Sequence, residues 1–202
     1  MSPRDDYTKA ARCPVCKLSP GLCICETLPR ITLPVEFIVI RHGTEREWHS
    51  NTGTLVGHIL ENSRVLDYGV KGAPFDSADL HADEVNLHVL FPRPGAQVLT
   101  PESLESPAAL VILDSTWPKA RRIWKRVAEL RDRPFFRLPP GPPPALTLRD
   151  PPDETRFFTL DAVARAVRAL GYETEGQEIE RVAREIVKRR LHLRGKFPRT
   201  EL

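Results

Sequence analysis

Four cysteines lie close together near the start of the 202-residue chain, and none occurs in the rest of it. They are Cys13, Cys16, Cys23 and Cys25. Four thiolates arranged as a tetrahedron are a common ligand set for structural zinc, and two residues between the first pair are typical of a turn that directs two sulfurs at one ion. The segment has few apolar residues of its own, so a bound metal would have to organise it. We therefore predict a zinc knuckle with four cysteine ligands.

Two other chemistries use clustered cysteines. A redox-active pair would account for Cys13 and Cys16, but it would leave Cys23 and Cys25 without a role. An iron–sulfur cluster also takes four thiolates, although the single residue between the second pair is less typical of one. The sequence leaves that possibility open. If the site is structural, its cysteines should lie away from any catalytic residue.

A second chemically capable group is Asp114, Ser115, Thr116 and Trp117, which follows the apolar stretch 109–113. That stretch predicts a buried strand. The carboxylate can accept a proton, the hydroxyls can hold a ligand, and the indole can stack on a nucleobase. The alternative is an ordinary helix N-terminus, in which a hydroxyl caps the helix and the tryptophan packs in the core.

Another polar group follows the mostly apolar stretch 35–40, which also predicts a buried strand. The loop at 41–51 contains His42 and Glu45, two further candidates for moving a proton.

Strands and helices are predicted to alternate along the chain. We expect strands at 35–40, 64–68, 85–91, 109–113 and 135–138, and helices at 53–61, from Pro118 onward, at 159–170 and at 175–192. Thr174 and Gln177 resemble a capping box for the last helix. Such alternation predicts an α/β domain with a mainly parallel sheet, in which ligands bind at the carboxyl ends of strands. We assign 1–32 to an N-terminal tail and the knuckle, and 33–202 to this domain.

The net charge of +3 is unevenly distributed. Residues 118–137 hold eight basic and two acidic side chains, and residues 179–202 hold eight and three. Two cationic stretches favour a phosphate-bearing partner such as RNA, and two solvated helix faces are the alternative. No apolar run is long enough to span a membrane, and the polar residues 1–10 do not resemble a signal peptide. We expect a cytoplasmic protein with no membrane contact.

Several short motifs, taken in order, resemble those of the DTW-domain family. Asp114–Trp117 is similar to its Asp-x-Thr-Trp signature, and the cysteines match its Cys-x-x-Cys followed by Cys-x-Cys. Its His-Pro-x-Glu, Thr-Asn-Thr-Gly, Tyr-Pro and Ser-Thr-Leu-Glu-Ala motifs correspond to residues 42–45, 50–53, 91–92 and 158–162. Each motif is short, but together they run through residues 12–190.

The resemblance implies a tRNA-uridine aminocarboxypropyltransferase. Such enzymes transfer the 3-amino-3-carboxypropyl group of S-adenosylmethionine to N3 of a tRNA uridine and release methylthioadenosine. The resemblance also implies a SPOUT-like fold with a deep trefoil knot, which is a rare feature. The chain departs from the family pattern at Gly43, Phe158 and Asp161, where the family has proline, serine and glutamate.

On this resemblance we expect Asp114 to act as the general base. Loops 91–96, 114–117 and 156–160 should form the S-adenosylmethionine pocket, with Arg156 pairing the carboxylate of the co-substrate. The expected cofactor-binding residues are Asn51, Thr52, Gly53, Phe91, Pro92, Thr116, Trp117, Arg156, Thr159 and Leu160. The expected RNA-binding residues are Lys119, Arg121, Arg122, Lys125, Arg126, Arg189 and Arg190.

Two other functions fit parts of the sequence. A SPOUT-type RNA methyltransferase would use the same co-substrate but would transfer its methyl group and release S-adenosylhomocysteine. A non-catalytic zinc-containing RNA-binding module would explain the cysteines and the basic helices, but it would leave Asp114–Trp117 without a role. No obligate protein partner is evident, and both a monomer and a dimer remain open.

Overall fold

The computed structural model describes residues 12–46, 48, 50–144, 146 and 158–201, in which strands and helices alternate as predicted. The strands are β1 (Glu36–His42), β2 (Ser63–Tyr68), β3 (Asn86–Leu90), β4 (Gln97–Val98), β5 (Ala108–Asp114) and β6 (Phe135–Arg137). The helices are α1 (Gly53–Ile59), α2 (Trp117–Arg126), α3 (Ala128–Arg131), α4 (Thr159–Ala169) and α5 (Glu173–Leu193). Short 3-10 helices are η1 (Pro20–Leu22), η2 (Cys25–Thr27), η3 (Gly43–Glu45), η4 (Ser77–Leu80) and η5 (Arg199–Glu201).

The strands form one sheet in the order β2-β1-β5-β3-β6-β4, and each neighbouring pair is parallel. This confirms the predicted α/β class with a mainly parallel sheet. Because the strands run in one direction, their carboxyl ends share one edge of the sheet. The register of β1 against β5 places Arg41 opposite Asp114 at that edge.

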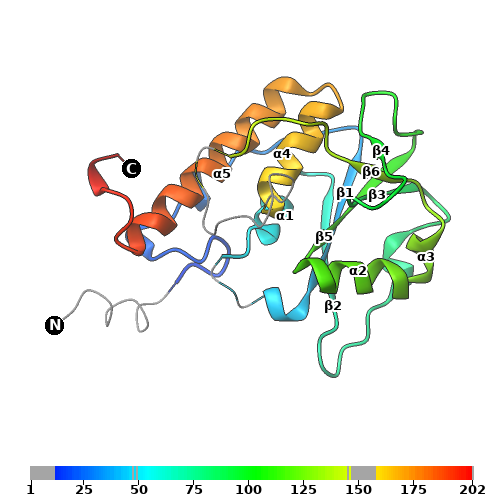
Figure 1. Ribbon diagram of the computed structural model, residues 1–202. Helices are drawn as coiled ribbons and strands as arrows, with labels where there is room; N and C mark the ends of the chain where they lie inside the picture. Colours follow the sequence, from blue (N-terminus) through cyan, green and yellow to red (C-terminus); the bar gives the residue numbers. More distant parts are fainter. Residues whose placement is uncertain (1–11, 47, 49, 145, 147–157, 202) are drawn as a thin grey trace.

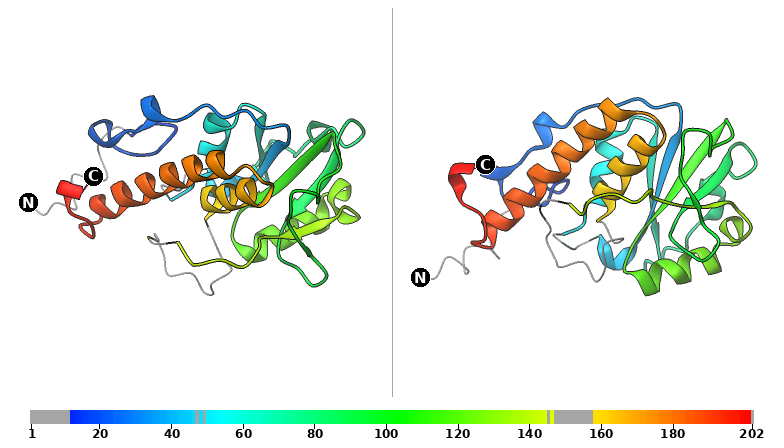
Figure 2. Two further views of the ribbon diagram at one scale, coloured as in Figure 1. Left: turned by 90° about the horizontal axis from the view of Figure 1, so that it is seen from above. Right: turned by 45° about the horizontal axis from the view of Figure 1, so that its top comes forward.

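Helices cover both faces of the sheet: α1, α4 and α5 lie on one side, and α2 and α3 lie on the other (Figures 1 and 2). Side chains along a strand alternate between the faces. Phe37 and Val39 therefore pack in the apolar cluster beneath α1, α4 and α5, whereas Ile38 and Ile40 pack in the cluster beneath α2. A strand buried on both faces is mostly apolar, here without a break over 37–40, which is why 35–40 could be identified from sequence.

The cysteine segment shares the core of the sheet and helices. Cys16, Leu18 and Ile24 are buried, and they belong to the same apolar cluster as Ile179 and Val182 of α5. Positioning this segment is therefore coupled to the packing of α5.

Three details differ from the predicted elements. The helix expected from Pro118 is split into α2 and α3, because the backbone of Val127 is extended between them. The capping box at Thr174 and Gln177 is wrong, since α5 already begins at Glu173 and the Gln177 amide donates to the Glu173 carboxylate. Strand β4 was not predicted, because two residues are too few to show a period. None of the helices in the described ranges is both long and apolar enough to cross a membrane.

Candidate active site

The carboxylate of Asp114 is buried at the carboxyl end of β5, where the residue is only 6% exposed. The Asn51 amide donates to Oδ2 at 2.5 Å, and the Thr159 hydroxyl donates to Oδ1 at 2.5 Å. Gly53 lies directly against the same group, because a Cβ atom built on it would come within 2.2 Å of Oδ2. Both carboxylate oxygens are thus held by residues from distant parts of the chain.

Burial raises the pKa of Asp114 above the usual range of an aspartic acid, because a low-dielectric surrounding disfavours the charged form. The hydrogen bonds from Thr159 and Asn51 offset part of this rise, and the negative charge of Glu45 adds to it. The ionised carboxylate is therefore a stronger base than a solvent-exposed aspartate.

A chain of polar contacts orients Asn51. Its Oδ1 accepts hydrogen bonds from the backbone N–H and the hydroxyl of Thr54, each at 3.2 Å. The Thr54 hydroxyl accepts from Arg41 Nη1 at 2.6 Å, and Arg41 in turn pairs with Asp67 at 2.7 Å. With its carbonyl directed at Thr54, Asn51 presents its NH2 group to Asp114.

Sequence analysis missed Arg41, Thr54 and Asp67 as parts of this site. Arg41 offered a signal, since a charged residue at the end of a strand buried on both faces needs a partner.

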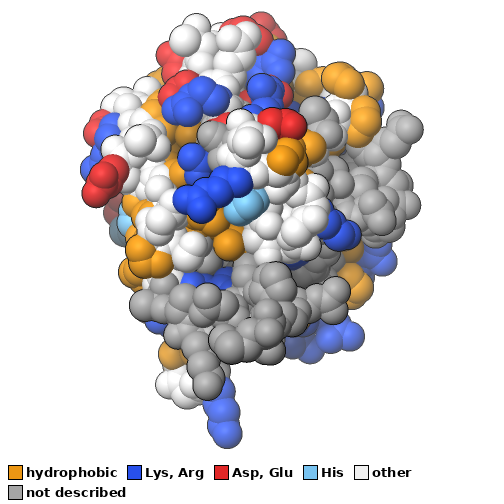
Figure 3. Space-filling view, turned by 90° about the vertical axis from the view of Figure 1, so that its left-hand side faces the viewer, with side chains coloured by type: hydrophobic (Ala, Val, Ile, Leu, Met, Phe, Trp, Pro, Cys, Tyr) orange, Lys and Arg blue, Asp and Glu red, His pale blue; other side chains and the backbone are white. Residues whose placement is uncertain are grey.

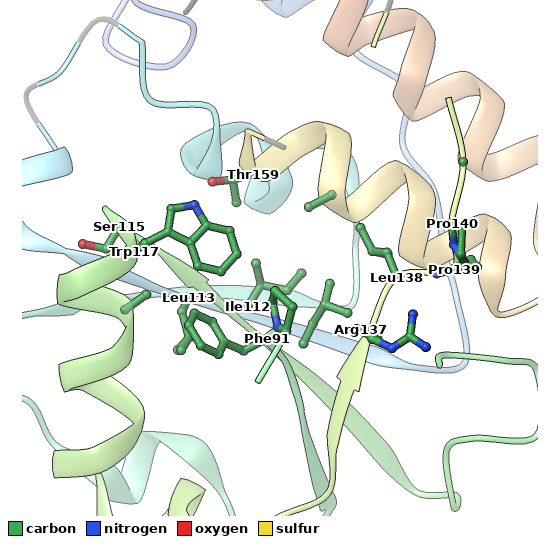
Figure 4. Close-up of a pocket in the computed structure, with 15 residues that line it drawn as sticks. Phe91, Ile112, Leu113, Ser115, Trp117, Arg137, Leu138, Pro139, Pro140 and Thr159 are labelled. Atoms are coloured by element: carbon green, nitrogen blue, oxygen red, sulfur yellow. The ribbon is translucent and has the colours of Figure 1, made fainter. Parts of the chain in front are cut away.

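A pocket of about 280 Å³ opens next to Asp114, at the carboxyl ends of β3, β5 and β6 (Figure 4). This volume is near the lower end of the range for small-molecule sites. The wall is mostly apolar. Its residues are Leu90, Phe91, Pro92, Ile112, Leu113, Ser115, Trp117, Ala120, Arg137, Leu138, Pro139, Pro140, Gly141, Thr159 and Ala162.

Four of the predicted cofactor-binding residues line this pocket: Phe91, Pro92, Trp117 and Thr159. Trp117 packs against Phe91, with ring centroids 5.2 Å apart, so it shapes the wall.

The other predicted contacts have different surroundings, and among the described residues none of them lines the pocket. The Thr52 hydroxyl accepts from the backbone N–H of Leu160 at 3.2 Å, and Leu160 is fully buried in the core. Asn51 and Gly53 contact Asp114 instead. Arg156 lies outside the described residues.

Thr116 occupies the N-cap position of α2, but its side chain makes no capping hydrogen bond within the described structure. The cap expected of an ordinary helix start is therefore not formed by this residue. Trp117 packs against the core cluster under α2, as the alternative expected, and it also lines the pocket.

The segment 137–141 forms a wall of the pocket that sequence analysis did not assign to the site. Arg137 is exposed, and its guanidinium makes no hydrogen bond or ion pair with any residue in the described ranges. The Ser115 hydroxyl is buried and, within the same ranges, has no hydrogen-bond partner. Within the described structure, the mostly apolar wall thus presents the unpaired guanidinium of Arg137 and the unsatisfied hydroxyl of Ser115. These groups suit a ligand that carries an anionic group. The sequence did contain one indication of this wall, because the proline run 139–144 follows a strand of the same sheet.

The loop after β1 brings His42 close to Lys119. His42 Nδ1 accepts from the backbone N–H of Thr44 at 3.2 Å, and Lys119 donates to the Thr44 hydroxyl at 2.6 Å. Burial and the charge of Lys119 lower the pKa of His42, which keeps its ring neutral near pH 7. Lys119, predicted to bind RNA, thus also holds this loop.

The four cysteine sulfurs all lie within 4.8 Å of one another and could bind one metal ion. The Sγ atoms of Cys13 and Cys25 are 3.4 Å apart, and those of Cys16 and Cys23 are 3.6 Å apart. Sulfurs of a tetrahedral site with metal–sulfur bonds of about 2.3 Å are separated by about 3.8 Å. Burial raises the pKa of the Cys13 thiol, but hydrogen bonds from the backbone amides of Cys16 and Val15 and from the Cys25 and Cys16 side chains together lower it to about 7.

Arg190 connects the cysteine segment to the active-site loop. Its Nη2 donates to the backbone oxygen of Cys16 at 3.3 Å and to that of Asn51 at 3.0 Å. With 4% of its surface exposed, Arg190 does not belong to the predicted RNA-facing surface. The cysteines, which are not among the pocket residues of the described chain, are thus linked to the site through backbone contacts.

The two predicted RNA-binding helices differ in how their charges are compensated. The cations Arg121, Arg122, Lys125 and Arg126 of α2 are exposed, and none pairs with an acidic residue in the part of the chain that the structure describes.

The charges of α5 are largely paired along the helix. Its ion pairs are Arg181–Glu178, Arg184–Glu180, Lys188–Glu185 and Arg189–Glu185. Figure 3 views the molecule from the side where α5 ends, and acidic and basic side chains alternate over the upper part of this face.

Comparisons with known proteins found a matching family model and a named relative. A family model described as DTW domain matches residues 10–191. The tRNA-uridine aminocarboxypropyltransferase 2 of Drosophila melanogaster is 24% identical over 178 residues, which cover 82% of this chain and 69% of that protein. No solved structure matches the chain significantly.

The contact between Gly53 and Asp114 predicts an unusual response to alanine. Gly53→Ala should destabilise the fold by about 1–3 kcal/mol, because the new methyl group overlaps a buried carboxylate. Gly57→Ala, in the same helix, meets only a Val65 methyl at 3.2 Å and should change stability by less than about 1 kcal/mol. Chemical denaturation of both variants measures the difference. Equal stabilities would show that the carboxylate does not lie against Gly53.

Proposed function

The chain belongs to the DTW domain family, and we propose that it is a tRNA-uridine aminocarboxypropyltransferase that uses S-adenosylmethionine. The observation that carries this proposal is the placement of the signature carboxylate. Asp114 is held as a strong base next to an apolar pocket, at the sheet edge where parallel α/β proteins bind ligands. The relative named for this activity supports the same reaction.

The pocket wall offers groups that match the chemistry of S-adenosylmethionine. Phe91 and Trp117 supply aromatic faces for the adenine, and Ser115 supplies a hydroxyl. Arg137 would pair with the carboxylate of the methionine part, the role that sequence analysis assigned to Arg156. When bound, S-adenosylmethionine supplies a carbon made electrophilic by the adjacent positive sulfur.

The protein's part in the reaction is to prepare the nucleophile and to select the carbon that it attacks. Uridine N3 carries a proton and becomes an effective nucleophile only when that proton is lost. Asp114 is proposed to be the final acceptor of this proton. The pocket wall would orient the co-substrate so that the aminocarboxypropyl carbon, rather than the methyl group, faces N3.

We also propose that the domain has the SPOUT-like fold that the family resemblance implies. The parallel sheet with its ligand pocket at the carboxyl edge is compatible with a SPOUT-like fold that contains a deep trefoil knot. A tRNA substrate also favours the cytoplasmic location expected from the sequence.

Product analysis tests the reaction. Unmodified tRNA incubated with the protein and S-adenosylmethionine should gain one aminocarboxypropyl group on a uridine, with an equal amount of methylthioadenosine, as measured by nucleoside mass spectrometry. Asp114→Asn, matched in size, should bind tRNA normally and form at least about 100-fold less product. S-adenosylhomocysteine as the product would instead support the methyltransferase, and tRNA binding without any modification would support the binding module.

We propose that the tRNA backbone lies over α2, which presents cations that no acidic residue of the described structure neutralises. The cations of α5 are less available, because Arg181, Arg184 and Arg189 are paired with glutamates. Lys119, at the start of α2, extends the cationic surface toward the loop beside Asp114.

Charge removal on the two helices should therefore have unequal effects. The double change Arg121→Gln and Arg122→Gln should weaken tRNA binding about tenfold and reduce the slope of log affinity against log salt by about two. Arg181→Gln with Arg184→Gln removes the same charge from α5 and should alter neither quantity appreciably. Filter binding across a salt series measures both, and equal losses from the two pairs would refute the assignment to α2.

We propose that the cysteine cluster holds structural zinc. The spacing of the four sulfurs is close to that of a tetrahedral site, and the segment packs on the core through Cys16, Leu18 and Ile24. The metal would keep this segment in place and thereby support the Arg190 contact with Asn51.

Metal analysis should find one zinc per chain. Its removal by a chelator should lower Tm by roughly 10 °C, because a loss of about 3 kcal/mol shifts Tm by about 2–4 °C per kcal/mol in a domain of this size. Added zinc should restore Tm. Iron with visible absorption, or thiols that bind no metal, would contradict the assignment.

A further inference from the structure

The burial of Asp114 creates a difficulty for its role as a base. The residue is 6% exposed, both carboxylate oxygens accept hydrogen bonds, and Asp114 does not belong to the pocket wall of the described structure. A uridine that enters the pocket therefore cannot place N3 against the carboxylate. The proton must reach Asp114 through one of its two hydrogen-bond partners.

Of the two partners, only Thr159 reaches the pocket within the described chain. Thr159 lines the wall and is the first residue of α4, and it lies on the same side of the pocket as Trp117 and Ser115, across from Arg137 (Figure 4). Asn51 is 6% exposed and is absent from the wall within the described residues. Its NH2 group is also a donor only, so it has no lone pair with which to take up a proton.

The Thr159 hydroxyl has the properties that a proton relay requires. Its hydrogen is committed to Asp114 Oδ1, at 2.5 Å between the oxygens. Its oxygen keeps free lone pairs, because a hydroxyl is both a donor and an acceptor. A uridine N3–H in the pocket can therefore donate to Thr159 Oγ1 while Thr159 donates to Asp114.

We propose that Thr159 is a catalytic residue that relays the N3 proton of the uridine to Asp114. This inference rests on the proposed function. As the bond forms between N3 and the aminocarboxypropyl carbon, the N3 proton passes to Thr159 Oγ1 and the Thr159 hydroxyl proton passes to Asp114 Oδ1. The bond between that carbon and sulfur breaks, and its electron pair stays on sulfur in methylthioadenosine.

The surroundings of Asp114 favour this route. Asn51 and Gly53 enclose Oδ2, which leaves Oδ1 directed at Thr159. The raised pKa of Asp114 makes the carboxylate a better final acceptor than an exposed aspartate. Since Asp114 must be ionised to accept the proton, the rate should fall as the pH drops through this raised pKa.

Replacing the hydroxyl tests the relay. Thr159→Val keeps the shape and should lower kcat about 100-fold or more, with little change in KM for either substrate. Thr159→Ser keeps a hydroxyl and should stay within about tenfold of the wild-type kcat. Calorimetric binding of S-adenosylmethionine and the melting temperature show whether the pocket and the fold are intact. A valine variant with wild-type kcat would overturn the proposal.

A more acidic substrate separates a relay from a merely structural role. A tRNA transcript with 5-fluorouridine carries an N3 proton that is lost more easily, so it depends less on the base. The kcat deficit of Thr159→Val, and that of Asp114→Asn, should both shrink at least about tenfold on this tRNA. A deficit that is the same on both transcripts would overturn the relay, since lost packing does not depend on the acidity of the substrate.

The double variant gives a further test, because two residues in one relay act as a unit. Thr159→Val combined with Asp114→Asn should be no slower than Asp114→Asn alone, whereas multiplied losses would indicate independent roles. If the valine variant does not fold, the wild-type rate can be measured against the deuterium fraction of the solvent. A curved dependence supports two moving protons, and a linear dependence refutes the relay. A wild-type protein that forms no aminocarboxypropyl-uridine would refute the proposed function itself.

Discussion

A carboxylate withdrawn from water is stable only when its oxygens receive hydrogen bonds, and this requirement at Asp114 organises the rest of the site. The two donors come from the loop before α1 and from the start of α4. Gly53 begins α1 without a side chain because the carboxylate occupies that space. Burial raises the pKa of Asp114, but it also keeps the carboxylate out of contact with the pocket. Asp114 is therefore the proposed base, and Thr159 is the residue that a substrate in the pocket can reach.

The cysteine segment is connected to the candidate site through Arg190. Cys16 packs in the core next to α5, and Arg190 of that helix bonds the backbone oxygens of Cys16 and Asn51. The orientation of the Asn51 amide toward Asp114 is thus supported from the backbone side by Arg190 and from the side-chain side by Thr54. A metal held by the cysteines would stabilise this arrangement without taking part in chemistry.

Much of the architecture was predictable because local sequence patterns indicate its strands and helices. Strands buried on both faces are continuous apolar runs, so β1 and β5 could be located, and their alternation with helices predicted the parallel sheet. Helix ends were less predictable. Val127 breaks the helix with an extended backbone, and α5 starts at Glu173, where a contact with Gln177 replaces the expected cap.

By itself, the sequence determined the cysteine cluster and the sheet class, and it singled out Asp114 as a candidate, because each depends on residue types at short spacing. The tertiary structure decided which of the other residues touch the pocket. Asn51 and Thr159 lie 63 and 45 positions from Asp114, and their meeting depends on strand register and on how α4 approaches the sheet. The tertiary structure also decided which of the predicted RNA-binding cations lie at the surface, because Arg190 is buried while the cations of α2 remain exposed. Arg190 follows Ile186 and Val187 at helical spacing, which places it on their face of α5. Only the packed chain, however, brings the backbone oxygens of Cys16 and Asn51 within its reach.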